Sequence, residues 1–238
     1  MVSVIVPALN EAETLPQTLA RARQALSSED EIIVVDGGSR DATKEIAAQS
    51  GARVIESERG RGRQMNAGAA TARGDVLLFL HADTWLPTGA GALIRQHCQN
   101  AAVLGGNFAL RFDTPGLLPA FFACIYNARS RRQRLFYGDS ALWVRRAVFD
   151  ELDGYGEAML MEDWAFCLQL RALAVRRHPD LPLRRSLPLI ELPVVTSARR
   201  FNGKRGRAWK MAAVWSLLHV LYACGVSTDW LERRFYRA

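Results

Sequence analysis

The sequence lacks the signatures of several large protein classes. Its four cysteines form no Cys-x-x-Cys pair and have no histidine at zinc spacing, which argues against a disulfide framework and a structural metal. We interpret Cys98, Cys124, Cys167 and Cys224 as reduced, mostly buried thiols. Neither Gly-x-Gly-x-x-Gly nor Gly-x-x-x-x-Gly-Lys-Ser/Thr occurs. The common dinucleotide fingerprint and the P-loop are therefore excluded.

Targeting and membrane-spanning segments are also absent from the pattern. Met1 leads directly into an apolar run, without the charged start and cleavage site of a signal peptide, which predicts a cytoplasmic protein. The stretch 211–226 is nearly all apolar, but it falls short of the roughly 20 residues that span a bilayer. We expect it to pack on the domain, to form a homodimer face, or to lie as an interfacial helix on the inner face of the cell membrane.

The charge balance favours an anionic partner. The 238 residues include 31 basic and 24 acidic side chains, a net charge of +7, and 49% are hydrophobic, enough for one sizeable core. Nucleotides, nucleic acids and acidic lipid surfaces all fit this sign. The basic run at 199–207 has few interleaved aromatic residues and no nucleic-acid module accompanies it, so we predict no nucleic-acid partner.

Strands and helices alternate through the first 87 residues. Apolar runs that read as strands are followed by segments of helical periodicity, which implies parallel pairing with right-handed crossovers. The predicted strands are 2–6, 31–35, 54–55 and 76–80. The predicted helices are 12–26, a second that Ser39 or Asp41 could cap and that runs to about Gln49, and a third into which the segment 59–68 leads and which runs through Ala72. No internal repeat or flexible linker interrupts the chain, so we expect one α/β domain.

The regular alternation of strands and helices ends after Pro87. We expect irregular chain at 84–87, a Pro-rich connection at 179–193, and a long apolar helix at the C-terminal end. The remaining predicted elements are a helix at 87–99, strands at 103–112 and 138–144, a helix from 161 to about 174, and the final helix at 208–224.

Three carboxylates follow predicted strands. Glu11, Asp36 and Asp83 each stand just beyond an apolar run. In a parallel sheet these strand ends share one edge, where ligands bind. Turn chemistry explains any one of them, whereas three together favour a site. Asp36 could accept hydrogen bonds from a base or ribose, and Asp83 is an oxygen ligand suited to a hard cation that bridges phosphates.

Two further groups of charged residues have both a functional and a plain interpretation. Arg59, Arg61 and Arg63, interleaved with glycines, could hold phosphate at a helix start or form a solvated basic loop. Glu162 and Asp163 could supply a general base for a hydroxyl nucleophile, or could be the acids that a helix dipole favours in its first turn.

Taken together, these motifs resemble the family-two glycosyltransferases, the inverting enzymes of the GT-A fold. The similar segments of the first half are Val-Ile-Val-Pro-Ala-Leu-Asn-Glu (4–11), Val-Val-Asp-Gly-Gly-Ser-Arg-Asp (34–41), Arg-Gly-Arg-Gly-Arg-Gln-Met-Asn-Ala-Gly (59–68) and Leu-Phe-Leu-His-Ala-Asp (78–83). Those of the second half are Tyr-Gly-Asp-Ser (137–140), Arg-Arg-Ala-Val-Phe (145–149) and Met-Glu-Asp (161–163). The Arg-Gly-Arg-x-Arg-Gln-Met-Asn and Thr-Ser-Ala-Arg-Arg segments look like those of a small bacterial subgroup.

The resemblance implies a fold and a division of the chain. It implies a mainly parallel central sheet flanked by helices, the nucleotide-diphospho-sugar transferase fold, with an apolar C-terminal helix extension. Residues 1–200 would form one catalytic domain, with a nucleotide-binding half at 1–87 and an acceptor half at 88–200. Residues 201–238 would form a basic loop and a helical extension.

The resemblance also implies roles for individual residues. Asp163 would be the catalytic base with Glu162 beside it, and Asp83 would hold a divalent cation, Mn²⁺ or Mg²⁺. A nucleotide sugar would be the donor, with a UDP-sugar favoured over a GDP-sugar, and the acceptor would be a hydroxyl, with a lipid or lipid-linked acceptor suiting membrane attachment. The implied donor-binding residues are Pro7, Leu9, Glu11, Asp36, Gly37, Arg63, Asn66, His81, Ala82, Arg199 and Arg200.

One departure from the family pattern concerns the metal. The family often has Asp-x-Asp where this chain has His81-Ala82-Asp83, so metal binding would rest on one carboxylate. The Gln-x-x-Arg-Trp motif of processive relatives is only echoed at 197–201, which argues against a polymer synthase. A metal-dependent nucleotidyltransferase and a non-catalytic nucleotide-sugar-binding protein remain as alternatives.

Overall fold

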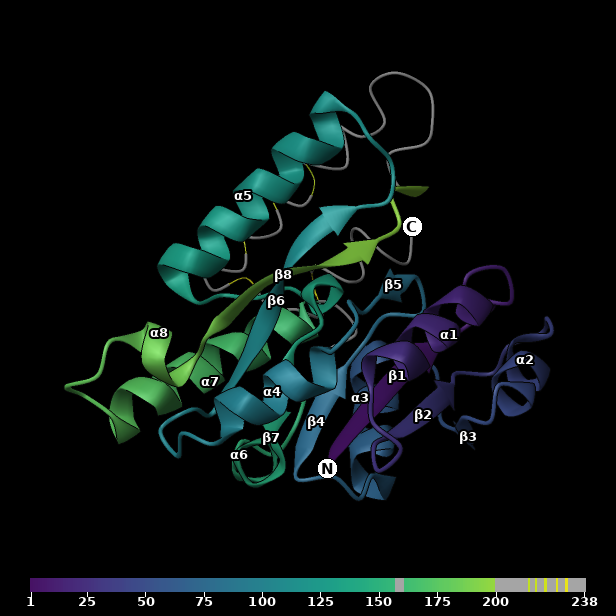
Figure 1. The fold of residues 1–238 in the computed structure, drawn as a ribbon, viewed down its shortest axis with the longest axis horizontal. Coiled ribbons are helices and arrows are strands. Elements are labelled where there is room, and N and C mark those ends of the chain that lie inside the picture. The colour runs from purple at the N-terminus through teal and green to yellow at the C-terminus, as the bar shows by residue number, and fades with distance from the viewer. Residues whose placement is uncertain are drawn as a thin grey trace.

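The computed structural model describes residues 1–156 and 161–199, together with the isolated positions 214, 217, 221, 226 and 230. This part of the chain forms an eight-stranded mixed sheet with the strand order β3-β2-β1-β4-β7-β6-β8-β5 and helices on both faces (Figure 1). The predicted α/β architecture, a central sheet flanked by helices, is thereby confirmed for these residues. The predicted extension at 201–238 and its helix lie almost entirely outside the described residues.

The first half of the chain is built from four parallel strands, as predicted. β1 pairs with β2 and β4, and β2 pairs with β3, all in parallel. Nearly every residue of β1, β2 and β4 is buried, which explains their continuous apolar runs. The elements are β1 (Val2–Ala8), α1 (Leu15–Ala25), β2 (Glu31–Asp36), α2 (Thr43–Gln49), β3 (Arg53–Glu56), α3 (Arg61–Thr71) and β4 (Val76–Phe79).

Two hydrophobic cores lie on opposite faces of the sheet. On one face, α1 packs Leu15 and Leu19 against alternate residues of β1. On the other face, α3 contributes Met65 and Ala69 to a core that continues into α6 and α7. Gly68 of α3 lies so close to Ile5 that a Cβ atom there would clash with it. This close approach sets α3, and the basic loop before it, against the carboxyl ends of β1 and β2.

The second half adds antiparallel strands and the longest described helices. β7 pairs antiparallel with both β4 and β6, and β6 pairs in parallel with β8. The elements are β5 (Thr84–Trp85), α4 (Ala90–Cys98), β6 (Gly105–Phe112), α5 (Leu117–Gln133), the short 3-10 helix η1 (Gly138–Ser140), β7 (Trp143–Arg145), α6 (Arg146–Glu151), α7 (Glu162–Arg177), α8 (Leu183–Ser186) and β8 (Leu189–Thr196).

Three sequence predictions in this half are wrong. Residues 84–85 are not irregular, because they form β5 on β8, with Thr84 Oγ1 2.9 Å from Thr196 Oγ1. The supposed connection at 179–193 contains α8 and most of β8. Its Pro193 lies where the β6–β8 register shifts, so the strand tolerates a residue that suggested a loop. The strand predicted from Gly138 begins only at Trp143, after η1.

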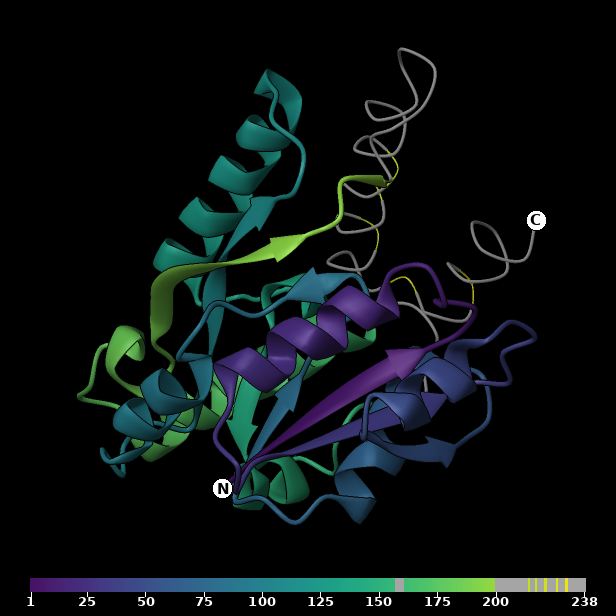
Figure 2. The same ribbon diagram turned by 45° about the vertical axis from the view of Figure 1, so that its right-hand side comes forward.

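The helix α5 is the clearest element that sequence reading did not assign. Its apolar and basic stretches form one continuous helix, which runs beside β6 and extends away from the first four strands (Figures 1 and 2). The side chain of Asn127 fixes it there, donating to the Leu110 carbonyl at 2.9 Å and accepting from the Leu110 N–H at 2.8 Å. Among the described residues, no helix combines the length and hydrophobicity needed to cross a bilayer.

The cysteine prediction is only partly right. The three cysteines in the described part of the chain are free thiols. Cys167 is buried and Cys98 is half-buried, as expected, but Cys124 on α5 is exposed.

Candidate active site

Asp36 stands at the carboxyl end of β2 and is completely buried. Its Oδ2 accepts hydrogen bonds from the N–H groups of Gly38 and Ser39, each at 2.9 Å. Its Oδ1 is buried and has no hydrogen-bond partner. A buried carboxylate oxygen without a partner is costly, and a donor group on a bound ligand would satisfy it. The predicted base or ribose contact fits this atom.

Glu11 and Asp83, at the ends of β1 and β4, share one guanidinium. Arg199 Nη2 lies 2.8 Å from Glu11 Oε1 and 3.1 Å from Asp83 Oδ2. The hydrogen bond to Glu11 and the charge of Asp83 raise the pKa of Arg199. The pairing of β5 with β8 brings Arg199 here, and the Ser197 N–H donates to the Asp83 carbonyl at 3.0 Å. Arg200, the other predicted residue, lies outside the described residues.

The metal prediction rests on Asp83 alone. Carboxylate oxygens are the hard ligands that Mn²⁺ and Mg²⁺ accept, so the chemistry of Asp83 fits such a cation. Within residues 1–156 and 161–199, no group of three histidine, cysteine, aspartate or glutamate side chains could hold a metal by itself. The other ligands would therefore be donor phosphates or water, and Arg199 would have to release Asp83.

Other predicted donor residues line the ends of β1 and β2. Pro7 and Leu9 are half-buried, and Gly37 is buried against the side chain of Gln64. The Gln64 amide donates to the carbonyls of Ala8 and Val35 at 2.9 and 2.8 Å, holding the two strand ends together. Sequence reading included Gln64 in a motif but gave it no role.

Three predicted donor residues have their polar groups engaged by the protein. Asn66 binds both backbone groups of Tyr155, donating at 2.8 Å and accepting at 2.9 Å. Arg63 pairs with the exposed Glu58. The carbonyl of Ala82 accepts from the Thr18 hydroxyl at 2.8 Å. Their contact with a nucleotide stays a prediction.

The two acids at the start of α7 have different environments. Asp163 Oδ2 accepts from the Gly138 N–H at 2.7 Å, and its Oδ1 accepts from the Trp164 N–H at 2.7 Å. Glu162 is only 3% exposed and pairs with Arg61 at 3.2 Å. Burial, helped by the charge of Asp163 and opposed by Arg61, raises the pKa of Glu162 to about 7. The half-buried Asp163 is therefore more accessible to a ligand than Glu162.

His81 lies near Asp163, the predicted base, and near the predicted donor edge, which we define as the strand ends that carry Glu11, Asp36 and Asp83. A Cβ atom added to Gly138 would lie 2.6 Å from His81 Nε2 and 3.4 Å from Asp163 Oδ2. His81 follows β4 and stands two residues before Asp83, so the donor edge and the α7 start meet around Gly138. Sequence reading singled out His81 only because of its neighbour, and it gave no role to Gly138.

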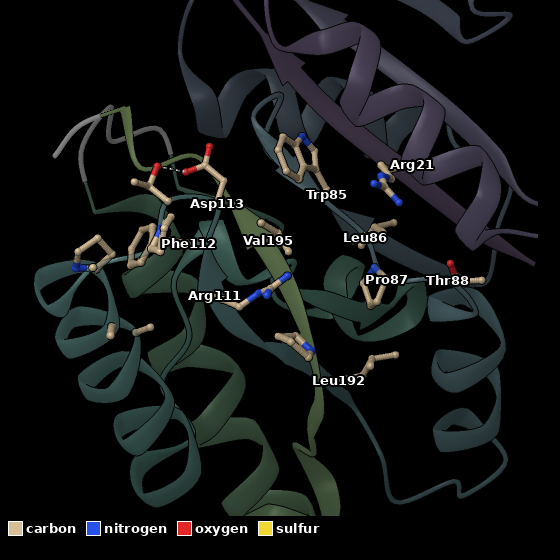
Figure 3. Close-up of a pocket in the computed structure, with 17 residues that line it drawn as sticks. Arg21, Trp85, Leu86, Pro87, Thr88, Arg111, Phe112, Asp113, Leu192 and Val195 are labelled. Atoms are coloured by element: carbon tan, nitrogen blue, oxygen red, sulfur yellow. Dashed lines mark hydrogen bonds between the residues drawn. The ribbon is translucent and has the colours of Figure 1, made fainter. Parts of the chain in front are cut away.

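A separate cavity of about 690 Å³ opens beside β5, β8 and the start of α5 (Figure 3). Apolar residues such as Trp85, Phe112 and Val195 line it, together with Arg21 and Arg111. It contains none of the predicted catalytic or nucleotide-binding residues. The candidate site is therefore defined by its chemistry and not by the size of the cavity.

Comparisons with known proteins show the family of this chain. The family described as Glycosyl transferase family 2 matches residues 3–152. A PGL/p-HBAD biosynthesis glycosyltransferase of Mycobacterium tuberculosis is 31% identical over 200 residues, which cover 74% of this chain and 73% of that protein. An undecaprenyl-phosphate 4-deoxy-4-formamido-L-arabinose transferase of Pseudomonas fluorescens is 38% identical over 97 residues, 36% of this chain and 28% of that protein's length.

Solved structures share the fold at low sequence identity. The mannosyltransferase PcManGT of Pyrobaculum calidifontis, in complex with GDP-Man and Mn²⁺, has a TM-score of 0.67 at 20% identity, and the match covers 95% of this chain and 64% of that one. A glucosyl-3-phosphoglycerate synthase of Mycobacterium tuberculosis, in complex with Mn²⁺ and UDP-glucose, has a TM-score of 0.62 at 19% identity, covering 95% and 80%. The chain belongs to glycosyl transferase family 2.

Proposed function

We propose that this protein transfers a sugar from a nucleotide-diphosphate sugar to a hydroxyl acceptor with inversion, with Asp163 as general base and a divalent cation at Asp83. The observation that carries the proposal is the meeting of Glu11 and Asp83 on the guanidinium of Arg199. The carboxylates follow two different strands, and the guanidinium comes from the segment after β8. All three meet at the sheet edge where α/β proteins bind ligands.

The donor would occupy the ends of β1, β2 and β4. The buried Oδ1 of Asp36 would accept a hydrogen bond from the base or ribose, and Arg199 would turn from the two carboxylates to the diphosphate. A cation bound at Asp83 would neutralise charge on the departing diphosphate. Mn²⁺ with GDP-Man or UDP-glucose in two neighbours of the same fold supports such a donor, and we favour a UDP-sugar.

The acceptor would approach from the side of α7. Asp163 would take the proton of the incoming hydroxyl, because the Gly138 N–H fixes the direction of its carboxylate. The buried Glu162, held by Arg61, would shape this helix start without contacting the acceptor. Attack opposite the leaving diphosphate would be a single displacement and would invert the sugar.

We propose a lipid or lipid-linked molecule as the acceptor. A relative acts, by its name, on undecaprenyl phosphate, which supports a lipid or lipid-linked acceptor and a cytoplasmic enzyme on the inner face of the membrane. The segment 201–238, where we place the membrane or homodimer contact, lies almost entirely outside the described residues.

Product analysis tests the proposal. The protein is incubated with UDP-glucose or GDP-mannose, with and without Mn²⁺. No other acceptor is added, so water takes the place of the acceptor hydroxyl. We expect slow, Mn²⁺-stimulated release of the nucleoside diphosphate. Asp83→Asn should remove the stimulation, whereas Asp75→Asn, at a side chain 89% exposed, should not. Release of pyrophosphate would instead indicate a nucleotidyltransferase, and no turnover of any donor would contradict the proposal.

A further inference from the structure

Arg129 on α5 lies in an aromatic cluster next to the predicted base. Its guanidinium carbon is 4.0 Å from the ring centre of Trp164 and 5.3 Å from that of Tyr137. It also donates a hydrogen bond to the Tyr137 hydroxyl. Cation–π contacts of this kind hold an arginine in a fixed orientation on the aromatic faces. The direction of the guanidinium edge is therefore set before any ligand arrives.

Arg129 is half-buried, and no carboxylate in the described part of the chain balances its charge. Among the described residues no acidic side chain pairs with Arg129, whereas Arg131, one half-turn further along α5, forms a two-point pair with Glu191. Burial lowers the pKa of Arg129, and the opposing effects come from Tyr137 and Tyr126. A desolvated cation without a counter-ion costs free energy. An anionic ligand would remove this cost.

The cluster adjoins Asp163 from two directions. Tyr137 precedes Gly138, whose N–H holds the Asp163 carboxylate, and Trp164 follows Asp163 in the chain. Burial raises the pKa of Tyr137 to about 12, and the charge of Asp163 adds to this rise, so the two groups interact. An anion bound by Arg129 would therefore lie beside Tyr137 and Trp164, the two residues next in the chain to Gly138 and Asp163.

We propose that Arg129 binds an anionic group, a phosphate or a carboxylate, of the hydroxyl acceptor, and so determines which acceptors present their hydroxyl to Asp163. This inference rests on the proposed function. The planar guanidinium fork matches phosphate and carboxylate oxygens in two-point contacts. The plain alternative is that Arg129 only anchors α5 to α7 through Trp164, in which case it would bind no ligand.

Calorimetry with glycerol 3-phosphate tests the proposal. The protein is first saturated with UDP and Mn²⁺ so that the donor phosphate site is filled. We expect the wild type to bind glycerol 3-phosphate and not neutral glycerol, and Arg129→Gln to weaken this binding at least about tenfold, the usual size of a charge-assisted contact. Arg132→Gln, at an exposed residue of the same helix, serves as the matched control and should leave the affinity unchanged.

Vesicles identify the source of the anionic group. A lipid headgroup is indicated if phosphatidylglycerol vesicles bind, phosphatidylcholine vesicles do not, and Arg129→Gln abolishes the difference. A soluble acceptor is indicated if only glycerol 3-phosphate responds to the variant. Both outcomes support the proposal.

Equal affinity of wild type and Arg129→Gln for both anionic probes, or no binding of either by the wild type, would overturn the proposal. UDP affinity and the unfolding midpoint of each variant confirm that it is folded. If Arg129→Gln does not fold, Arg129→Lys keeps the charge but loses the fork, and it should weaken binding several-fold; unchanged affinity would again overturn the proposal. Failure of the proposed function would appear separately, as absent UDP binding or absent nucleoside diphosphate release.

Discussion

The donor edge and the acceptor side of this site are built by different kinds of contact. At the proposed donor edge, Asp36 ends β2, Glu11 and Asp83 follow β1 and β4, and the parallel pairing of these strands places their carboxyl ends at one edge of the sheet. On the acceptor side, Asp163 is held by Gly138 of η1, 25 residues away. Local sequence therefore marks the carboxylates of the donor edge, whereas on the acceptor side only long-range packing shows which residues meet. The two sides should respond differently to substitution.

The largest expected effect is on the acceptor side. Asp163→Asn removes the predicted base while preserving the shape of the side chain, so it should lower the transfer rate by about 10³-fold, the range of general-base catalysis. Release of nucleoside diphosphate at saturating donor measures the rate. If Glu162→Gln lost the transfer activity to this extent while Asp163→Asn stayed active, Glu162 and not Asp163 would be the base.

A smaller loss is expected where the two sides meet. Gly138→Ala places a Cβ atom 2.6 Å from His81 Nε2 and against Asp163, so the ring and the carboxylate must shift. A displacement of this size costs on the order of 10²-fold in rate. Gly156→Ala, with no atom within 4 Å of the new Cβ, is the control. Full activity of Gly138→Ala would show that this contact does not position the base.

The smallest effect concerns stability and its dependence on pH. Because the pKa of Glu162 rises from an ordinary value of 4.5 to about 7 on folding, this group stabilises the fold fully below pH 4.5. That contribution is lost as the pH rises through about 7. Relative to wild type, Glu162→Gln should therefore gain unfolding free energy between pH 5 and 8, by at most about 1.4 kcal/mol per pH unit.

Denaturant titrations at several pH values measure this difference. Glu191→Gln is a useful control because pairing with Arg131 lowers the pKa of Glu191. Its stabilisation is present above the unfolded pKa and is lost in acid, the opposite direction. The same pH dependence in wild type and Glu162→Gln would contradict a raised pKa at Glu162.

The first half of the chain was predictable from the sequence to a greater extent than the second half. Three parallel strands of the first half, β1, β2 and β4, were predicted because each one is a buried apolar run with a clear end. In the second half, α5 was not assigned, because its residues are apolar on several sides and only packing against β6 defines its faces. Strand β8 was missed because Pro193 lies in its bulge. Long-range pairing supplied what local pattern could not.

The site shows the same limit. The carboxylates were identified from their place after strands, and the acid pair from its helix start. Arg199 was expected among the donor-binding residues, yet its bridge between Glu11 and Asp83 depends on contact between residues 188 positions apart. Gly138 lay in a recognised motif and Arg129 did not, but neither was given a role, because their contacts arise only when η1, α5 and α7 pack together.

The most direct test of this account is a calorimetric titration of UDP with Mn²⁺ into two variants. Asp36→Asn has one acceptor oxygen where the carboxylate has two. Its NH₂ group must therefore face either the N–H groups of Gly38 and Ser39 or the donor group of the ligand, and neither arrangement allows a hydrogen bond there. We predict binding of UDP at least about tenfold weaker. Asp163→Asn lies on the acceptor side and should bind as the wild type does. Intact binding by Asp36→Asn together with lost binding by Asp163→Asn would contradict the division between donor edge and acceptor side.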